Sequence, residues 1–344
     1  MSDFNFLKVA KVDRLTRDSV ALSFEVPNEL KKDYGFISGQ YLTLEVVINE
    51  LKVRRSYSIC SGPRELLKVG IKKVKGGLFS NYIVDKIQTG DLISVAIPQG
   101  RFLYNSKGDK ELITGIAAGS GITPILSIAK HVLDANNENE FRLIYGNKSL
   151  SSEMFSQEIE SLKELYPSRL KVVNVYSQSN EKQGMYGRID ISIITYYREK
   201  YNIADKYYIC GPESMINSIS DVLLKEEVPK NKIFYELFTA SNISVIEKSN
   251  AIVSKLDIVY DGKTYCLENV SGKTVLEVAI QNEVDVPYSC QGGVCSSCIA
   301  KVVEGGARMR ANQVLTEEEV EEGIILTCQA EVKEDYAKVD FDDI

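Results

Sequence analysis

Hydrophobic and polar positions alternate in short runs over about the first hundred residues of the chain. The runs are rich in β-branched and aromatic residues, and Gly, Pro and Asn signals such as Ser38-Gly39 and Thr89-Gly90-Asp91 separate them. Short strands at this spacing are typical of an antiparallel β-barrel. We expect the strands at Phe6–Val12, Val20–Val26, Tyr41–Ile48, Tyr57–Cys60, Leu67–Ile71 and Leu92–Ile97.

From Lys110 onward the pattern changes to short apolar runs that alternate with helical patterns. Such alternation predicts a parallel α/β sheet. The expected strands are Glu111–Ile116, Phe141–Tyr145, Leu170–Tyr176, Lys206–Cys210 and Lys232–Leu237, and the expected helices are Pro124–Leu133, Ser152–Leu165, Asp190–Lys200 and Glu213–Glu226.

A third unit follows a polar stretch that fits neither rhythm, so we expect a linker at residues 239–253. Leu256–Tyr260 and Lys263–Cys266 flank the turn pair Asp261-Gly262, which is a hairpin signal. A helical pattern follows at Val275–Asn282. The chain is therefore expected to hold three domains, at residues 1–107, 108–238 and 254–344.

Composition agrees with several globular domains, since the chain has 344 residues, 44 % hydrophobic and 26 % charged. The first residues lack the apolar core of a signal peptide, and no run of about 18 apolar residues occurs. We therefore expect no membrane insertion and a cytoplasmic location.

The net charge of −7 is unevenly distributed. Residues 254–344 hold 8 Lys/Arg and 18 Asp/Glu, a balance of −10 that leaves +3 for the rest of the chain. An acidic region of this kind makes nucleic acid an unsuitable partner and favours a basic protein partner.

Four of the seven cysteines lie in the last sixth of the chain, as C-x₄-C-x₂-C followed by a distant fourth. This is the ligand spacing of plant-type [2Fe-2S] ferredoxins. A zinc site and a dithiol pair fit less well, because the fourth cysteine has no neighbour and a dithiol pair needs only two. The predicted ligands are Cys290, Cys295, Cys298 and Cys328.

The loop between these cysteines has small residues. We expect Gly292 and Gly293 to adopt positive φ angles, and Ser296 and Ser297 to leave backbone N–H groups free for the sulfurs.

Two motifs in the predicted barrel suggest a flavin. Arg55-Ser56-Tyr57-Ser58 offers a guanidinium for a pyrophosphate, a ring for a flavin face and a hydroxyl for the ring nitrogen. Gly76-Gly77-Leu78-Phe79-Ser80 precedes an expected helix at Asn81–Lys86, whose N-terminus would present N–H groups to phosphate. Each motif alone is a weak signal, and their order carries the argument.

Two further motifs suggest a nicotinamide dinucleotide. Gly119-Ser120-Gly121 lies between an expected strand and an expected helix, with Thr123 as N-cap and Pro124 as the first helical residue. Cys210-Gly211-Pro212 ends another strand, at the sheet edge where open α/β folds bind ligands. Without that context, Cys210 fits a small buried hydrophobe equally well.

In this order, the five motifs resemble the ferredoxin–NADP⁺ reductase superfamily fused to a C-terminal ferredoxin domain. The resemblance covers nearly the whole chain and looks closest to reductase components of multicomponent oxygenases, especially the phenylacetyl-CoA epoxidase type. It implies an FAD-binding β-barrel, an NAD(P)-binding α/β domain and a β-grasp-like ferredoxin domain.

The resemblance also implies an activity: hydride passes from NADPH or NADH to FAD, then single electrons pass to the cluster and onward to an acceptor protein, an oxygenase component. Ser58, Cys210 and Glu236 are implied at the site of hydride transfer. The implied cofactor-binding residues are Arg55, Ser56, Tyr57, Ser58, Gly77, Leu78, Phe79, Ser80, Gly119, Ser120, Gly121, Thr123, Pro124, Lys148, Ser177, Gln178, Gly211, Pro212 and Phe238.

One departure affects the choice of nucleotide. Members that prefer NADPH commonly place a Ser-Arg pair after the strand that ends at Tyr176, where this chain has Ser177-Gln178. Gln can hydrogen-bond a 2′-phosphate but cannot offset its charge, and Lys148 or Lys182 could substitute. NADH and NADPH therefore both stay open at this point. Two alternative functions also stay open: a reductase for a hybrid-cluster protein, desaturase or haem oxygenase, and a redox sensor with negligible turnover.

Overall fold

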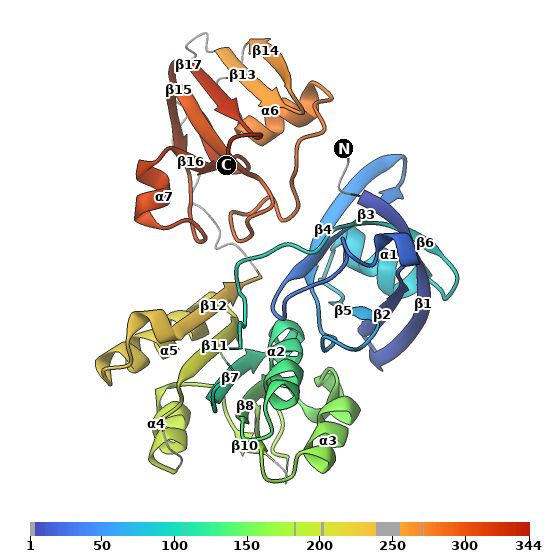
Figure 1. The fold of residues 1–344 in the computed structure, drawn as a ribbon, viewed down its shortest axis with the longest axis vertical. Coiled ribbons are helices and arrows are strands. Elements are labelled where there is room, and N and C mark those ends of the chain that lie inside the picture. Colours follow the sequence, from blue (N-terminus) through green and yellow to red (C-terminus); the bar gives the residue numbers. More distant parts are fainter. Residues whose placement is uncertain are drawn as a thin grey trace. The chain divides into compact units, whose positions relative to one another are not determined.

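The computed structural model describes residues 4–106, 108–181, 184–200, 203–238, 255–268, 270 and 272–344. These residues fall into two compact units, one within residues 2–238 and the other within 239–344 (Figure 1). The linker expected at residues 239–253 lies outside the described residues.

The first unit opens with a six-stranded antiparallel sheet in the order β4-β3-β6-β1-β2-β5. An isolated bridge between Ile59, directly after β4, and Val69 in the middle of β5 connects the two outer strands, so the sheet curls into a barrel. Helix α1 contacts β5, β3 and β4. The elements are β1 (Phe4–Thr16), β2 (Ser19–Glu25), β3 (Tyr41–Ile48), β4 (Leu51–Ser58), β5 (Leu67–Lys72), α1 (Leu78–Lys86) and β6 (Leu92–Ala96).

Several boundaries in the barrel differ from the sequence-based prediction; β1, for example, ends at Thr16 rather than Val12. Strand β4 begins at Leu51 rather than Tyr57, because Asn49 and Glu50 form a tight turn with φ angles of 51° and 66°. This pair is not one of the Gly-containing hairpin signals, so the pattern did not reveal it. Helix α1 begins at Leu78, three residues before the expected Asn81.

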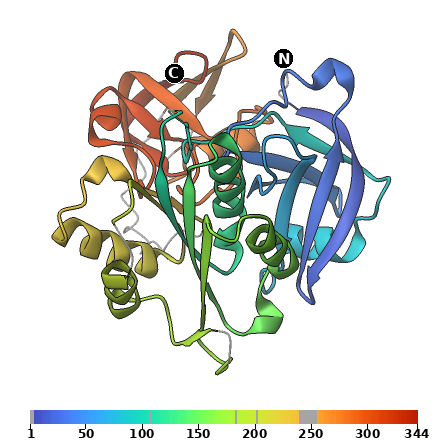
Figure 2. The ribbon, with the colours of Figure 1, turned by 60° about the horizontal axis from the view of Figure 1, so that its bottom comes forward.

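The first unit continues with a six-stranded parallel sheet in the order β10-β9-β8-β7-β11-β12. Helices lie on both sides of the strands (Figure 2). The elements are β7 (Leu112–Ala118), α2 (Ile122–Ala135), β8 (Glu140–Asn147), α3 (Ser156–Leu165), β9 (Leu170–Tyr176), β10 (Met185–Tyr186), α4 (Ile191–Lys200), β11 (Lys206–Gly211), α5 (Glu213–Lys225) and β12 (Ile233–Leu237).

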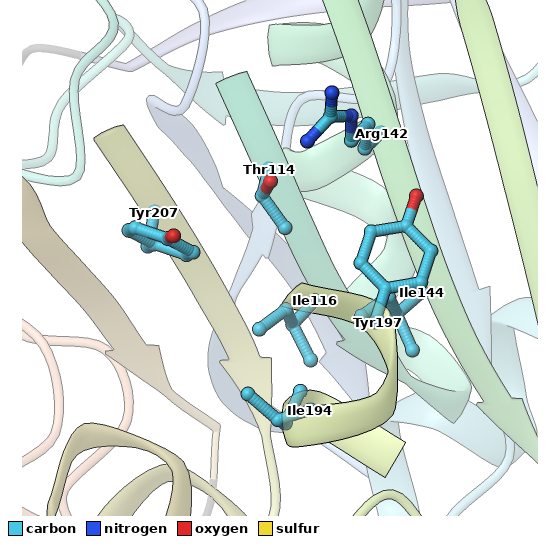
Figure 3. Close-up of a pocket in the computed structure, with 7 residues that line it drawn as sticks. All are labelled: Thr114, Ile116, Arg142, Ile144, Ile194, Tyr197 and Tyr207. Carbon is cyan, nitrogen blue, oxygen red and sulfur yellow. The ribbon is translucent and has the colours of Figure 1, made fainter. Parts of the chain in front are cut away.

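The two faces of this sheet follow from strand alternation. Ile113, Phe141 and Leu143 belong to the core that contains the apolar residues of α2 and α3. Their neighbours Thr114 and Ile144 point to the opposite face and line a cavity of about 10 Å³ under α4 (Figure 3). None of the predicted site residues lines this cavity, which has room for one water molecule at most.

Polar contacts hold the barrel against α2 and α3 of the parallel sheet. The Ser127 hydroxyl of α2 donates to the Ser61 carbonyl at 2.7 Å. The buried ammonium of Lys130, also in α2, lies 2.6 Å from a Glu65 carboxylate oxygen and pairs with Glu158 of α3. The Lys130 ammonium is buried and its two carboxylate partners are partly exposed, so this ion-pair network links the barrel to α2 and α3 at the edge of their contact.

The second unit is a mixed five-stranded sheet in the order β14-β13-β17-β15-β16, with helix α6 packed on β17. Strands β13 and β17 are parallel and the other pairs antiparallel, as in a β-grasp-like ferredoxin domain. The elements are β13 (Lys255–Tyr260), β14 (Lys263–Glu268), α6 (Val275–Gln281), β15 (Ile299–Met309), α7 (Glu317–Glu321), β16 (Ile324–Leu326) and β17 (Ala330–Asp340).

The hairpin of this unit has the turn that the sequence predicted. Asp261 and Gly262 have φ angles of 52° and 68°. The Asp342 carboxylate accepts hydrogen bonds from both of their backbone N–H groups, at 3.0 and 2.9 Å. Across the described residues, no helix has the length and apolar character needed to cross a membrane.

Candidate functional site

Three predicted residues from distant parts of the chain meet where the barrel adjoins the parallel sheet. Ser58 is the last residue of β4, and its hydroxyl donates to a Glu236 carboxylate oxygen at 3.0 Å. Glu236 in β12 is the register partner of Cys210 in β11. Both residues lie at the carboxyl ends of their strands, so the structure brings together the three residues implied at the site of hydride transfer.

Burial controls the protonation of this group. It raises the pKa of Glu236 to about 7, while the hydrogen bond from Ser58 opposes the shift. Burial, with a smaller effect from Glu236, raises the pKa of the Cys210 thiol well above its usual value. Cys210 is therefore a neutral thiol and not a nucleophile at physiological pH, whereas Glu236 changes its charge there.

We expect the rate of flavin reduction to fall about fivefold as pH rises through 7, the effect of one hydrogen bond of about 1 kcal/mol. Below pH 7, the protonated Glu236 can donate to the Ser58 oxygen, which leaves the Ser58 hydrogen available to a bound cofactor. Above pH 7, the carboxylate takes that hydrogen. Stopped-flow reduction at saturating NADH tests this, and Glu236→Gln should remove the step. A step of the same size in the variant would assign it to another group.

The turn before α2 differs from its sequence-based description. Helix α2 begins at Ile122 after a 3₁₀ turn, so Gly121 is the N-cap, and Thr123 and Pro124 lie inside the first turn. The Thr123 hydroxyl does not cap the helix but donates to the Ser120 carbonyl at 3.0 Å. The Thr123 hydroxyl therefore stabilises the 3₁₀ turn that precedes α2.

The two glycines of this turn have different roles. Gly119 has a φ of +54°, and a Cβ there would have no atom within 4 Å. At Gly121 a Cβ would lie 2.2 Å from the Cys210 carbonyl oxygen. The turn therefore packs directly against the backbone of β11, while its Gly119 side stays open for a ligand to approach.

Tyr145 supports this turn in a way that the sequence did not reveal. Its side chain is fully buried in β8, and its hydroxyl donates to the Gly119 carbonyl at 3.2 Å and lies 3.3 Å from the Met154 carbonyl. The sequence pattern identified this residue only as the end of an expected strand. No sequence signal separates a supporting tyrosine from an ordinary core residue of a strand.

The residues expected near the adenosine end lie side by side. The Ser177 N–H donates to the Asn147 carbonyl and the Gln178 N–H to the Lys148 carbonyl, both at 2.9 Å. The chain thus places Lys148 beside the Ser177-Gln178 pair after β9. Lys182, the other cation considered for this position, lies outside the described residues.

The remaining residues implied at the cofactors, two for the nucleotide and Phe238 for the flavin, lie at the ends of β11 and β12. Gly211 is the last residue of β11, and Pro212 is the N-cap of α5. Phe238 directly follows β12, and 37 % of its surface is exposed.

In the barrel, Tyr57 and Phe79 form a tilted aromatic pair with ring centroids 5.8 Å apart. Burial raises the pKa of Tyr57, although Arg55 opposes the shift, so the phenol keeps its proton. Arg55 is half-buried on the same strand, and its guanidinium donates to the Arg54 carbonyl at 2.6 Å. The Ser56 hydroxyl lies 3.1 Å from that of Thr43 on β3.

The first turn of α1 fits a phosphate group through its backbone. No side chain caps this end of the helix, where Gly77 is the N-cap and Leu78 is exposed. Phe79 and Ser80 are buried, and the Ser80 hydroxyl already accepts a hydrogen bond from the Val74 N–H at 3.0 Å. A flavin pyrophosphate here would therefore be held by helix N–H groups rather than by the Ser80 hydroxyl.

The four predicted cluster cysteines converge on one loop of the second unit. Cys290, Cys295 and Cys298 lie between α6 and β15, and Cys328 follows β16. The sulfurs of Cys290 and Cys295 are 3.1 Å apart. The thiols of Cys290 and Cys298 both interact with that of Cys328.

These thiols fit a two-iron cluster. The sulfur of Cys290 interacts with those of both Cys295 and Cys328, so the two segments that carry the cysteines meet at one place. Nowhere in the described parts of the chain do three His, Cys, Asp or Glu side chains converge on the position of one metal ion. A [2Fe-2S] cluster does not require such a group, because its four cysteines are shared between two irons.

The loop conformation departs from the prediction at one glycine. Gly293 has a φ of +72°, as expected, but Gly292 does not adopt a positive φ, and Gln291 does, at +55°. The backbone N–H group of Gly292 lies 3.4 Å from the Cys290 sulfur, whereas the N–H contacts expected of Ser296 and Ser297 stay a prediction. The Ser297 side chain contributes as well, with its hydroxyl 3.5 Å from the Cys295 sulfur.

Three family models match the chain in the same order as these sites. An oxidoreductase FAD-binding domain matches residues 6–104, an oxidoreductase NAD-binding domain residues 116–221, and a 2Fe-2S iron-sulfur cluster binding domain residues 258–333.

Relatives cover almost the whole chain. The chain is 35 % identical to a subunit of the 1,2-phenylacetyl-CoA epoxidase of Escherichia coli (strain K12), over 99 % of both chains. It is 31 % identical to the ferredoxin reductase component of the 3-ketosteroid-9-alpha-monooxygenase of Rhodococcus rhodochrous, over 97 % of this chain and 96 % of that one. The structure matches that of phthalate dioxygenase reductase with a TM-score of 0.65 and 25 % identity, over 98 % of each chain.

Proposed function

We propose that this chain, which belongs to the ferredoxin–NADP⁺ reductase superfamily with a C-terminal plant-type [2Fe-2S] domain, is the reductase component of a phenylacetyl-CoA epoxidase. The chain is an oxidoreductase that transfers electrons from NAD(P)H through FAD to a [2Fe-2S] cluster for an oxygenase partner. The observation that carries the choice of partner is the 35 % identity to the epoxidase component over 99 % of both chains.

The cofactors divide the chemistry between them: FAD accepts two electrons as hydride and releases them singly, and the cluster accepts one at a time. The residues of the chain bind these cofactors and orient them. We assign the pyrophosphate of FAD to the first turn of α1 and to Arg55, supported by the uncapped helix end and the half-buried guanidinium. We assign the cluster to the four convergent cysteines.

We assign the Ser58 hydroxyl a role in hydride transfer, and its hydrogen bond to Glu236 supports this assignment. The short contact between them fixes the hydroxyl at the end of β4, beside Cys210 of β11. A neutral Cys210 side chain suits contact with a nicotinamide ring, since it brings no charge. Gly119–Gly121, Lys148 and Ser177-Gln178 are assigned to the rest of the nucleotide.

We further propose domain bounds at residues 1–107, 108–238 and 254–344. The change from β-barrel to parallel sheet between β6 and β7 and the division of the chain after Phe238 support them. We place the protein in the cytoplasm, where the pool of reduced nicotinamide nucleotide lies.

The test of the proposed partner is reconstitution with the oxygenase subunits of the epoxidase, phenylacetyl-CoA and O₂. One NAD(P)H, one O₂ and one proton should give one epoxide, one water and one NAD(P)⁺. The proposal predicts stoichiometric epoxide formation that depends on this chain. Normal reduction of ferricyanide without epoxide formation would contradict it, and coupled turnover with the ketosteroid oxygenase instead would reassign the partner.

A further inference from the structure

The buried side chain of Gln329 packs against the loop of the second unit that carries the cluster cysteines. Gln329 directly follows Cys328, and only 5 % of its surface is exposed. A buried amide in a small domain is costly unless it is hydrogen-bonded. Its amide oxygen has no hydrogen-bond partner among the described residues, so the contacts of its amide nitrogen indicate what it does.

The amide nitrogen of Gln329 has three acceptors within reach. It donates to the Gln291 carbonyl at 3.2 Å and to the Cys328 carbonyl at 3.0 Å, and it lies 3.6 Å from the Cys328 sulfur. The last distance suits an N–H donor to sulfur, because sulfur is larger than oxygen. The opposite amide orientation would put oxygen against two carbonyl oxygens, so the hydrogen-bond pattern fixes the nitrogen on this side.

The same side chain packs on the loop. A Cβ at Gly293 would lie 2.9 Å from the Gln329 Cγ, so the glutamine stem occupies the space that this glycine leaves open. The Gln291 carbonyl that it holds belongs to a residue with a left-handed φ of +55°. Gln329 thus spans the loop from Gln291 across Gly293 to Cys328.

We infer that Gln329 is a positioning residue for the cluster that fixes the loop and raises the reduction potential through its N–H bond to the Cys328 sulfur. Reduction adds negative charge to the cluster, and a donor to a ligand sulfur stabilises the more negative state more strongly. The inference rests on the assignment of Cys328 as a cluster ligand and holds whichever oxygenase accepts the electrons. It concerns the transfer of single electrons from the flavin to the cluster, not the transfer of hydride from the nucleotide to the flavin.

The test is Gln329→Met in the full-length holoprotein. Methionine is unbranched and of similar length, so it keeps the packing over Gly293 but has no N–H donor. Gln281→Met is the matched control, because Gln281 is exposed on α6 of the same unit and its side chain accepts a hydrogen bond from Lys273. The readout is an anaerobic redox titration of the cluster by EPR, with the flavin potential as an internal reference.

At a fixed ambient potential, Gln329→Met should lower the ratio of reduced to oxidised cluster about three- to tenfold, where tenfold is about 59 mV for one electron. The flavin potential and the Gln281→Met protein should match the wild type. An unchanged cluster potential in Gln329→Met, or an equal shift in Gln281→Met, would overturn the inference. Absence of a cluster from the wild-type protein would instead overturn the proposed function.

A second measurement does not depend on the variant assembling its cluster. Glutamine labelled with ¹⁵N at the side-chain amide should give a hyperfine coupling to the reduced wild-type cluster in pulsed EPR. The coupling should persist in Gln291→Leu, whose own side chain is exposed. Its absence from the labelled wild-type protein would also overturn the inference.

Discussion

Replacing Cys298 with Ser is expected to abolish electron delivery to the oxygenase, with a loss of about 100-fold or more, because a plant-type cluster needs all four cysteine ligands. The thiol is buried and interacts with Cys328, so its loss removes one corner of the site. The visible bands of the cluster should disappear, while the flavin bands stay. Reduction of ferricyanide by NAD(P)H should stay within about twofold, since FAD supports it without the cluster.

Cys266→Ser provides the matched control for this experiment. Cys266 belongs to the same unit but is exposed on β14, where it interacts with Asp257 rather than with the other thiols. The same substitution there should leave cluster and turnover unchanged. If the Cys298→Ser protein still reduced the oxygenase at the wild-type rate, electrons would have to leave from the flavin directly.

Replacing Gly121 with Ala should lower kcat/KM for NAD(P)H about 100-fold, the size of effect that a misplacement of about 1 Å in an active site produces. The new Cβ would lie 2.2 Å from the Cys210 carbonyl oxygen, so either the turn or β11 must shift. Both border the position assigned to the nicotinamide. The measurement is stopped-flow flavin reduction over a range of nucleotide concentrations, with FAD content and cluster absorbance as checks on folding.

Gly119→Ala separates backbone strain from steric displacement in the same turn. It places a Cβ on a residue with a φ of +54° but with open space around it. Its cost in the free energy of unfolding should be about 1–2 kcal/mol of left-handed strain, and the new methyl should raise KM for the nucleotide, because it points into the space assigned to that ligand. An unchanged flavin reduction rate at saturating nucleotide in Gly121→Ala would show that the contact between Gly121 and Cys210 does not position the site.

The strand pattern and the cysteine spacing were sufficient to predict the larger features of this protein. Alternation located most barrel strands, and β3 and β9 have the bounds that the pattern predicted. The C-x₄-C-x₂-C spacing led to the matching cluster-binding domain because it reflects how one loop must supply three thiolates. Both features are local in sequence, and therefore a single chain reveals them.

Contacts made over long sequence distances could not be read in this way. Ser58 and Glu236 are 178 positions apart, and only the resemblance to a family suggested that both belong to one site. The bond from Tyr145 to the Gly119 carbonyl depends on how two strands are placed, not on residue type. Gln329 was not singled out either, because a glutamine after a cysteine has no pattern of its own.

Local conformation was hard to predict where neighbouring residues could each form the helix start or each adopt the left-handed φ. Thr123 and Pro124 have the chemistry of a helix start, yet the helix begins two residues earlier because Gly119–Gly121 already forms a 3₁₀ turn. In the cluster loop, Gln291 takes the left-handed conformation that was expected of Gly292. The bond from the Gln329 amide to its carbonyl supports that choice.

The central claim is that one chain carries electrons from a nicotinamide nucleotide through a flavin to its own [2Fe-2S] cluster. An anaerobic titration of the purified protein with NADH and, separately, NADPH tests it most directly, followed by visible absorbance and EPR. The account predicts that flavin and cluster bands bleach together at low reductant and that the signal of a reduced [2Fe-2S] cluster appears. Flavin and cluster bands that neither nucleotide bleaches would contradict it and would point to a redox sensor instead.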